Sequence, residues 1–132
     1  PHILADIFPH LCAGPVPTGD HVREITRFCL DRDLRAAERL DTRNQLVIAL
    51  VDHALANGIG SYTGVAERSW FAQVATFGWR CEALGQPVRH RDQFLIALHI
   101  HIDASTPSML ERAGIHASLQ YQLSAPRHGR RA

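Results

Sequence analysis

Hydrophobic and polar positions alternate with a period of two in the last third of the chain, over residues 98–103 and again over 115–124. Successive side chains of a β-strand point to opposite faces, so the alternation predicts two strands, each with one wet and one dry face. The first of these segments extends back to about residue 93, and apolar residues occupy both faces of the predicted strand in that part. A helix over 93–103 is the alternative, but isoleucine and phenylalanine favour a strand.

Apolar residues recur at helical spacing in the first two thirds of the chain. They predict helices over about residues 21–31, 33–57 and 65–84. Asn57-Gly58 is a typical helix stop, and the glycines that follow predict a loop over 58–64. The apolar centre of the second helix, residues 46–51, would also fit a central strand.

A short helix is predicted between the two C-terminal strands, because Pro107 suits a first helical turn and Gly114 suits a helix end. The expected fold is therefore α+β and mostly α. About three amphipathic helices pack on a small C-terminal β element of strand, short helix and strand. An all-α bundle is the alternative.

One globular domain over residues 1–125 and a basic, flexible tail over 126–132 complete the predicted organisation. A sheet of two strands is marginal by itself. It needs support from the helices, from a further strand or from a second copy of the chain. The last possibility predicts a homodimer.

Composition is that of an ordinary globular protein, with 45% hydrophobic and 20% charged residues. No apolar run is long enough to cross a membrane. Three widely spaced cysteines predict reduced thiols and a cytoplasmic location. All 14 basic residues are arginine. This use of arginine is typical of a GC-rich bacterial genome, and a net charge of +1 argues against strong non-specific binding of nucleic acid.

His99, His101 and Asp103 share one face of the predicted strand and form the clearest candidate for chemistry. Two histidines at positions i and i+2 aim their imidazoles the same way, within reach of one divalent ion. Asp103 would complete the ligand set, and His116 would add a ligand if the second strand paired beside the first. The alternative interpretation is that these polar residues are simply the solvent-facing side of an amphipathic strand and have no role in chemistry.

The His99-Ile100-His101 pattern is similar to the histidine–hydrophobic–histidine strand of HUH-type endonucleases. The resemblance implies metal binding by the two histidines and attack on a phosphate by a tyrosine, here Tyr121. That family carries its tyrosine on a helix, whereas Tyr121 lies on a predicted strand. Its sheet-based fold also differs from the predicted helical body, so the chain is not assigned to the family.

A helix-turn-helix is a second candidate, with Ala54, Gly58 and Ile59 before the helix that starts near Val65. Arg68 would then face a nucleic-acid groove. Arginines in the tail offer a third candidate, a contact with phosphates or an acidic partner. These are Arg127, Arg130 and Arg131.

The expected function is a non-enzymatic binding or regulatory module without a cofactor, acting as a homo-oligomer on protein or nucleic acid. The alternative is a metal-dependent hydrolase or nuclease that uses His99, His101 and Asp103 to hold a divalent metal ion. The chain has no nucleophile elbow, glycine-rich phosphate loop or H-E-x-x-H motif.

Overall fold

A computed structural model describes residues 9–25 and 36–116 of the chain. The described elements follow one another as η1 (Pro9–Leu11), β1 (Val22–Glu24), α2 (Ala36–Asn57), β2 (Ser61–Glu67), α3 (Arg68–Val74), β3 (Arg80–Ala83), β4 (Val88–His90), β5 (Gln93–His101) and α4 (Thr106–Arg112).

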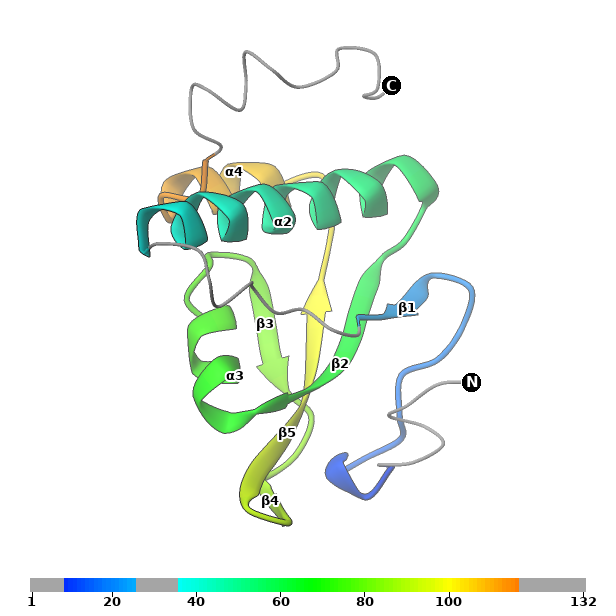
Figure 1. Cartoon of the computed structure of the whole chain (residues 1–132). Coiled ribbons are helices and arrows are strands. Elements are labelled where there is room, and N and C mark those ends of the chain that lie inside the picture. The colour runs from blue at the N-terminus through cyan, green and yellow to red at the C-terminus, as the bar shows by residue number, and fades with distance from the viewer. Residues whose placement is uncertain (1–8, 26–35, 117–132) are drawn as a thin grey trace.

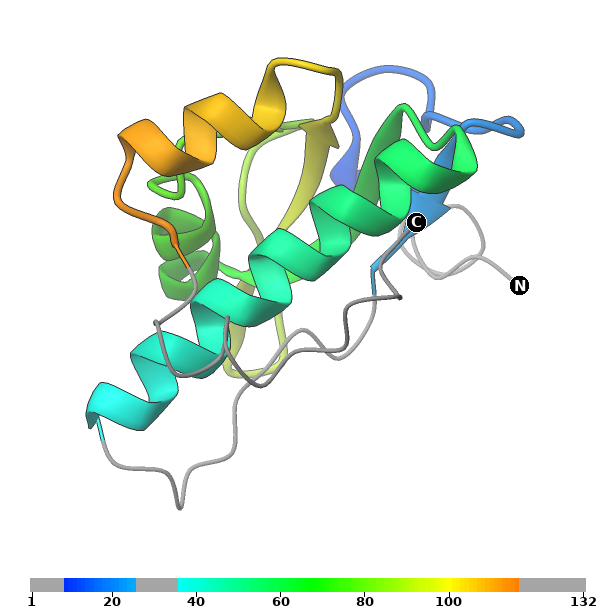
Figure 2. The ribbon, with the colours of Figure 1, turned by 90° about the horizontal axis from the view of Figure 1, so that it is seen from above.

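A mixed sheet of five strands organises the fold (Figure 1). Its strand order is β1-β2-β5-β3, and β4 also pairs with β5. β1 runs parallel to β2, whereas β5 is antiparallel to β2, β3 and β4. β5 is therefore the central strand, and the three residues of β1 form an edge. Figure 2 shows α2 and α4 side by side when the molecule is seen from above.

The three helices cover one face of the sheet. Apolar side chains of α2, α3 and α4 share a core with the β2 and β5 side chains on this face, among them Tyr62 and Ile100. Tyr62 also donates a hydrogen bond of 2.6 Å to the backbone carbonyl of Leu50, which ties α2 to the sheet.

The opposite face is apolar at one end and polar at the other. Leu95 and Ala97 of β5 pack there against Leu11, from the segment that begins with η1. Ala13 N donates to Leu84 O at 2.7 Å, which fixes this segment beside β3. Further along the same face, β5 carries His99 and His101. Side chains two residues apart on a strand share a face, so the change in polarity follows the strand.

This architecture contradicts the predicted fold class. The sheet is not a small C-terminal element on a helical body, and the chain is not an all-α bundle, because four of the five strands precede β5. The predicted helix over 21–31 is wrong at its start, where β1 forms; residues 26–31 lie outside the described part. The predicted loop over 58–64 and helix over 65–84 are replaced by β2, α3 and β3.

The error over 65–84 has a physical cause. Its aromatic stripe resembles one helix face, but α3 stops at Val74 and Gly78 takes a φ of +100° that breaks the helical path. The chain turns, and Trp79 is buried with its indole Nε1 donating to Val74 O at 3.0 Å. The same side chains therefore reach one core from a helix, a turn and a strand.

Three predicted elements are confirmed: α2, β5 and α4 fall within the segments expected for them. Ile115 and His116 are not in a strand, and the rest of the strand predicted over 115–124 lies outside the described residues, as does the tail 126–132. In the described part, no helix combines the length and hydropathy that a membrane crossing needs. Cys12 and Cys81 are free thiols.

Candidate functional site

A band of polar residues crosses the sheet on the face opposite the helices. The strand register places Glu24 of β1 level with Thr63 of β2, Thr63 opposite His99 of β5, and His99 opposite Glu82 of β3. Each strand thus contributes one polar residue to the same row. A second row beside it pairs Ser61 with His101 and His101 with Arg80. Thr63 is fully buried, so the band lies inside the protein at this point.

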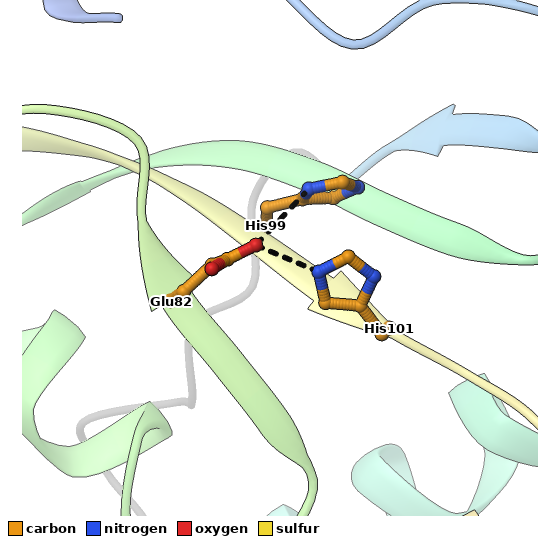
Figure 3. Close-up of side chains that lie close together, drawn as sticks. All are labelled: Glu82, His99 and His101. Carbon is orange, nitrogen blue, oxygen red and sulfur yellow. Dashed lines mark hydrogen bonds and ion pairs between the residues drawn. The ribbon is translucent and has the colours of Figure 1, made fainter. Parts of the chain in front are cut away.

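Glu82, His99 and His101 form the closest cluster in this band (Figure 3). His101 Nε2 lies 2.8 Å from Glu82 Oε2, and His99 Nδ1 lies 3.8 Å from the same oxygen. The two imidazole rings are 4.2 Å apart between centroids and tilted by 48°. The sheet therefore holds two imidazoles against one carboxylate.

The three side chains of this cluster differ in their exposure to solvent. The His99 side chain is 14% exposed, His101 is 35% exposed and Glu82 is 59% exposed. Burial lowers the pKa of His99, the neighbouring His101 lowers it further, and Glu82 acts in the opposite direction. The hydrogen bond from His101 is the main cause of a lowered pKa at Glu82. The arrangement favours an ionised Glu82 beside a neutral His99.

His99 Nε2 is buried and has no hydrogen-bond partner in the part of the chain that the structure describes. Leaving a buried polar atom unpaired costs about 1–3 kcal/mol, so nearly all such atoms in native structures have a partner in the protein or in ordered water. A neutral imidazole nitrogen can accept a hydrogen bond, accept a proton or ligate a metal. Ligand atoms of Glu82, His99 and His101 all lie within 4.8 Å of one another, a spacing that also suits a divalent ion.

The structure brings together two of the four residues predicted to bind metal and places the others elsewhere. Asp103 receives a hydrogen bond of 3.0 Å from Arg80, and its other oxygen accepts from the backbone N of Ser105 at 2.8 Å. It therefore caps the turn before α4. His116 is exposed, and its backbone carbonyl accepts from Asn44 Nδ2 at 3.1 Å.

The residues predicted to contact nucleic acid or a partner do not form one surface. Arg68 begins α3, and its guanidinium lies over the ring of Phe94, 4.6 Å from the centroid. Arg127, Arg130 and Arg131 lie outside the described residues. The helix-turn-helix is absent from the described chain because residues 61–67, which would have led into its second helix, form β2.

Glu82 was missed by sequence reasoning because residues 65–84 resembled a single helix. On a helix, Glu82 would be remote from His99. The signal that could have placed it is Gly78, which interrupts the helical stripe and leaves the short Arg80–Ala83 segment free to pair as a strand. Cys81, next to Glu82, faces the helices; burial, with a smaller effect from Glu82, raises its pKa to about 11, so it is not a reactive thiol.

Comparison with protein families gives a match between residues 1–110 and the autoinducer synthase family. The fold is also similar to solved structures. MesI, a CoA-dependent acyl-homoserine lactone synthase, is 27% identical with a TM-score of 0.74, over 90% of this chain and 60% of MesI. BjaI, another CoA-dependent acyl-homoserine lactone synthase, solved with MTA, is 27% identical with a TM-score of 0.73, over 89% of this chain and 55% of BjaI.

LasI, an AHL synthase, has the same fold with a TM-score of 0.75 at 22% identity, over 83% of this chain and 57% of LasI. This chain therefore spans three fifths or less of the length of each of these proteins.

These relatives correct the functional expectations. They are synthases, so the predicted non-enzymatic binding or regulatory module is wrong, and so is the alternative of a metal-dependent hydrolase or nuclease. The expected DNA-binding and metal-binding roles, which depended on those two functions, are therefore also wrong. The family match covers most of the chain, and the strands and helices follow the synthase fold. The chain belongs to the autoinducer synthase family.

Proposed function

We propose that this chain acts in CoA-dependent acyl-homoserine lactone synthesis, by transferring the acyl group of an acyl-CoA to the amine of S-adenosylmethionine (SAM). The observation that carries the proposal is the likeness to MesI over 90% of this chain. BjaI, which has been solved with SAM and isopentyl-CoA, supports the choice of substrates at 25% identity and a TM-score of 0.75, over 89% of this chain and 55% of BjaI.

The chemistry of these substrates is self-consistent. The amine of SAM attacks the thioester carbonyl, an amide C–N bond forms, and the C–S bond breaks to release CoA. Attack of the SAM carboxylate on its own γ-carbon then closes the lactone and releases methylthioadenosine (MTA), with the sulfonium sulfur as the leaving group. MTA is the molecule found in one BjaI structure.

We place the reaction in the bacterial cytoplasm, where SAM and acyl-CoA are made, and the free thiols of Cys12 and Cys81 accord with a reducing compartment. Self-association of the chain and partner contacts of Arg127, Arg130 and Arg131 remain predictions.

The direct test is to incubate the purified chain with SAM and acyl-CoAs of graded chain length, and to analyse the products by mass spectrometry. We expect acyl-homoserine lactone, free CoA and MTA in equal amounts. Omitting SAM should abolish release of CoA. Release of CoA without amide formation, or no product from any acyl-CoA, would overturn the proposal.

A further inference from the structure

Three arginines gather at the tip of the β4–β5 hairpin, at the end of the sheet away from α2 and α4 (Figure 1). Arg89 lies directly opposite Phe94 in the β4–β5 register, so both side chains leave the same face of the sheet. Arg68, at the start of α3, reaches the same ring, and its guanidinium carbon lies 4.6 Å from the Phe94 centroid. Arg91 follows Arg89 in the turn of the hairpin. The fold thus brings like charges together from two separate elements.

The charge of this arginine cluster, Arg68, Arg89 and Arg91, is only partly balanced by carboxylates. All three residues are exposed, and none forms an ion pair with a carboxylate in the described part of the chain. The carboxylates nearest in sequence are Glu67 and Asp92. Glu67 caps the first turn of α3. An excess of exposed positive charge attracts anions from solution.

The backbone of Arg91 supports a role for its side chain. Its φ of +59° makes it the one non-glycine residue of the described chain in the left-handed region. Glycine or asparagine is favoured there in a short hairpin turn, so arginine is a less favourable choice for the fold. Arg89 Nε donates to Arg91 O at 3.3 Å, a bond that uses neither terminal nitrogen of the Arg89 guanidinium.

We propose that the arginine cluster binds the phosphate groups of acyl-CoA, and that Phe94 is a positioning residue that holds the Arg68 guanidinium in place. The inference rests on the proposed function and deepens it, because it assigns the nucleotide end of the acyl donor to named residues of this chain.

The chemistry of the ligand matches the cluster. Acyl-CoA carries a diphosphate and a 3′-phosphate at its nucleotide end, remote from the thioester that reacts. A guanidinium remains charged at neutral pH and donates two parallel hydrogen bonds to phosphate oxygens. The cluster should therefore distinguish a CoA thioester from a thioester that lacks the nucleotide.

The test compares acyl-CoA with the N-acetylcysteamine thioester of the same acyl group, which has no phosphate. We expect Arg68→Gln and Arg89→Gln each to raise KM for acyl-CoA by about 10-fold, the loss of one charge-assisted contact, with kcat unchanged. KM for the N-acetylcysteamine thioester should not change. Arg112→Gln, at an exposed arginine of α4, is the matched control and should keep both KM values. No rise for acyl-CoA, or an equal rise for both donors, would overturn the proposal.

Arg91→Gly separates ligand binding from folding. Glycine adopts a positive φ without strain, so the urea unfolding midpoint should stay the same or rise. KM for acyl-CoA should nevertheless rise by about 10-fold. An unchanged KM would show that Arg91 only shapes the turn, and would overturn its part in binding.

Calorimetric titration with adenosine 3′,5′-bisphosphate tests the cluster without the reaction. Its affinity should fall by about 10-fold in Arg89→Gln and stay at the wild-type value in Arg112→Gln. Equal losses in both variants would indicate non-specific attraction of anions and would overturn the proposal. If wild type binds this nucleotide and makes no acyl-homoserine lactone, the proposed function is wrong and the phosphate site is not. If wild type makes the lactone with equal KM for both donors, the phosphate site is wrong and the proposed function is not.

Discussion

Glu82 lies directly opposite His99 in the β3–β5 register, yet its short contact is the diagonal one with His101, at 2.8 Å. Diagonal neighbours on adjacent strands are within reach of long side chains, and the twist of a sheet brings one diagonal closer than the other. The two histidines therefore differ in their partners. His101 Nε2 donates a hydrogen bond to the Glu82 carboxylate, whereas His99 Nε2 is buried and has no partner among the described residues.

Stability should depend on pH through His99. Its pKa is below 6.5 in the folded chain, mainly because of burial, so the unfolded chain binds the proton first as the pH falls. The free energy of unfolding should therefore decrease as the pH falls from 6.5 toward the folded pKa, and change no further through this group below it. Urea unfolding from about pH 8 to about pH 5 measures the slope.

The matched variants for this experiment are His99→Gln and His116→Gln. The first should flatten the slope below pH 6.5, and the second should keep it. Glu82 adds a loss of the same sign at lower pH, because its lowered pKa means that stability falls once the pH drops below 4.5. An unchanged slope in His99→Gln would show that another group is responsible.

Gly85 should tolerate no side chain. A Cβ there would lie 2.2 Å from Leu11 O and 3.1 Å from Ala13 N, both backbone atoms of the segment that covers the apolar end of the sheet. We expect Gly85→Ala to displace this segment, to cost about 1–3 kcal/mol and to speed proteolysis within residues 9–16.

Gly14→Ala is the control for that substitution, because no heavy atom of the described residues, its two chain neighbours aside, lies within 4 Å of the added Cβ. It should leave both the unfolding midpoint and the proteolysis rate close to wild type. Equal behaviour of the two variants would mean that the close approach of Leu11 to Gly85 does not hold the segment in solution.

Asn44 should contribute more to stability than a typical polar residue of α2. It is buried, its Nδ2 donates to His116 O at 3.1 Å, and its Oδ1 accepts from Arg43 Nη2 at 2.8 Å. Asn44→Ala removes the link between α2 and the residues after α4 and leaves a carbonyl without its donor. We expect a loss of about 1–3 kcal/mol in urea unfolding.

Asn57→Ala provides the comparison on the same helix. Asn57 is exposed at the end of α2, and within the described residues its side chain bonds locally, to His53 O at 2.8 Å. Its loss should change stability by about 0.5 kcal/mol or less. Similar effects of the two substitutions would contradict the inter-element role of Asn44.

The sequence by itself determined the elements whose signals are local. Alternation over 93–103 indicated β5, helical spacing up to Asn57-Gly58 indicated α2, and Pro107 with Gly114 bounded α4. Each of these signals depends only on near neighbours in the chain. The same alternation placed His99 and His101 on one face, which the structure confirms.

Tertiary structure decided the sheet and the identity of the third member of the cluster. β2 is covered on both faces, so its residues do not alternate, and a Cβ at Gly64 would lie in tight contact with the Ile25 carbonyl, at 3.2 Å. β1 and β3 are short and gain their hydrogen bonds from strands distant in sequence. Glu82 meets His99 and His101 only through such a pairing, because backbone hydrogen bonding between remote segments leaves no periodic trace in the chain.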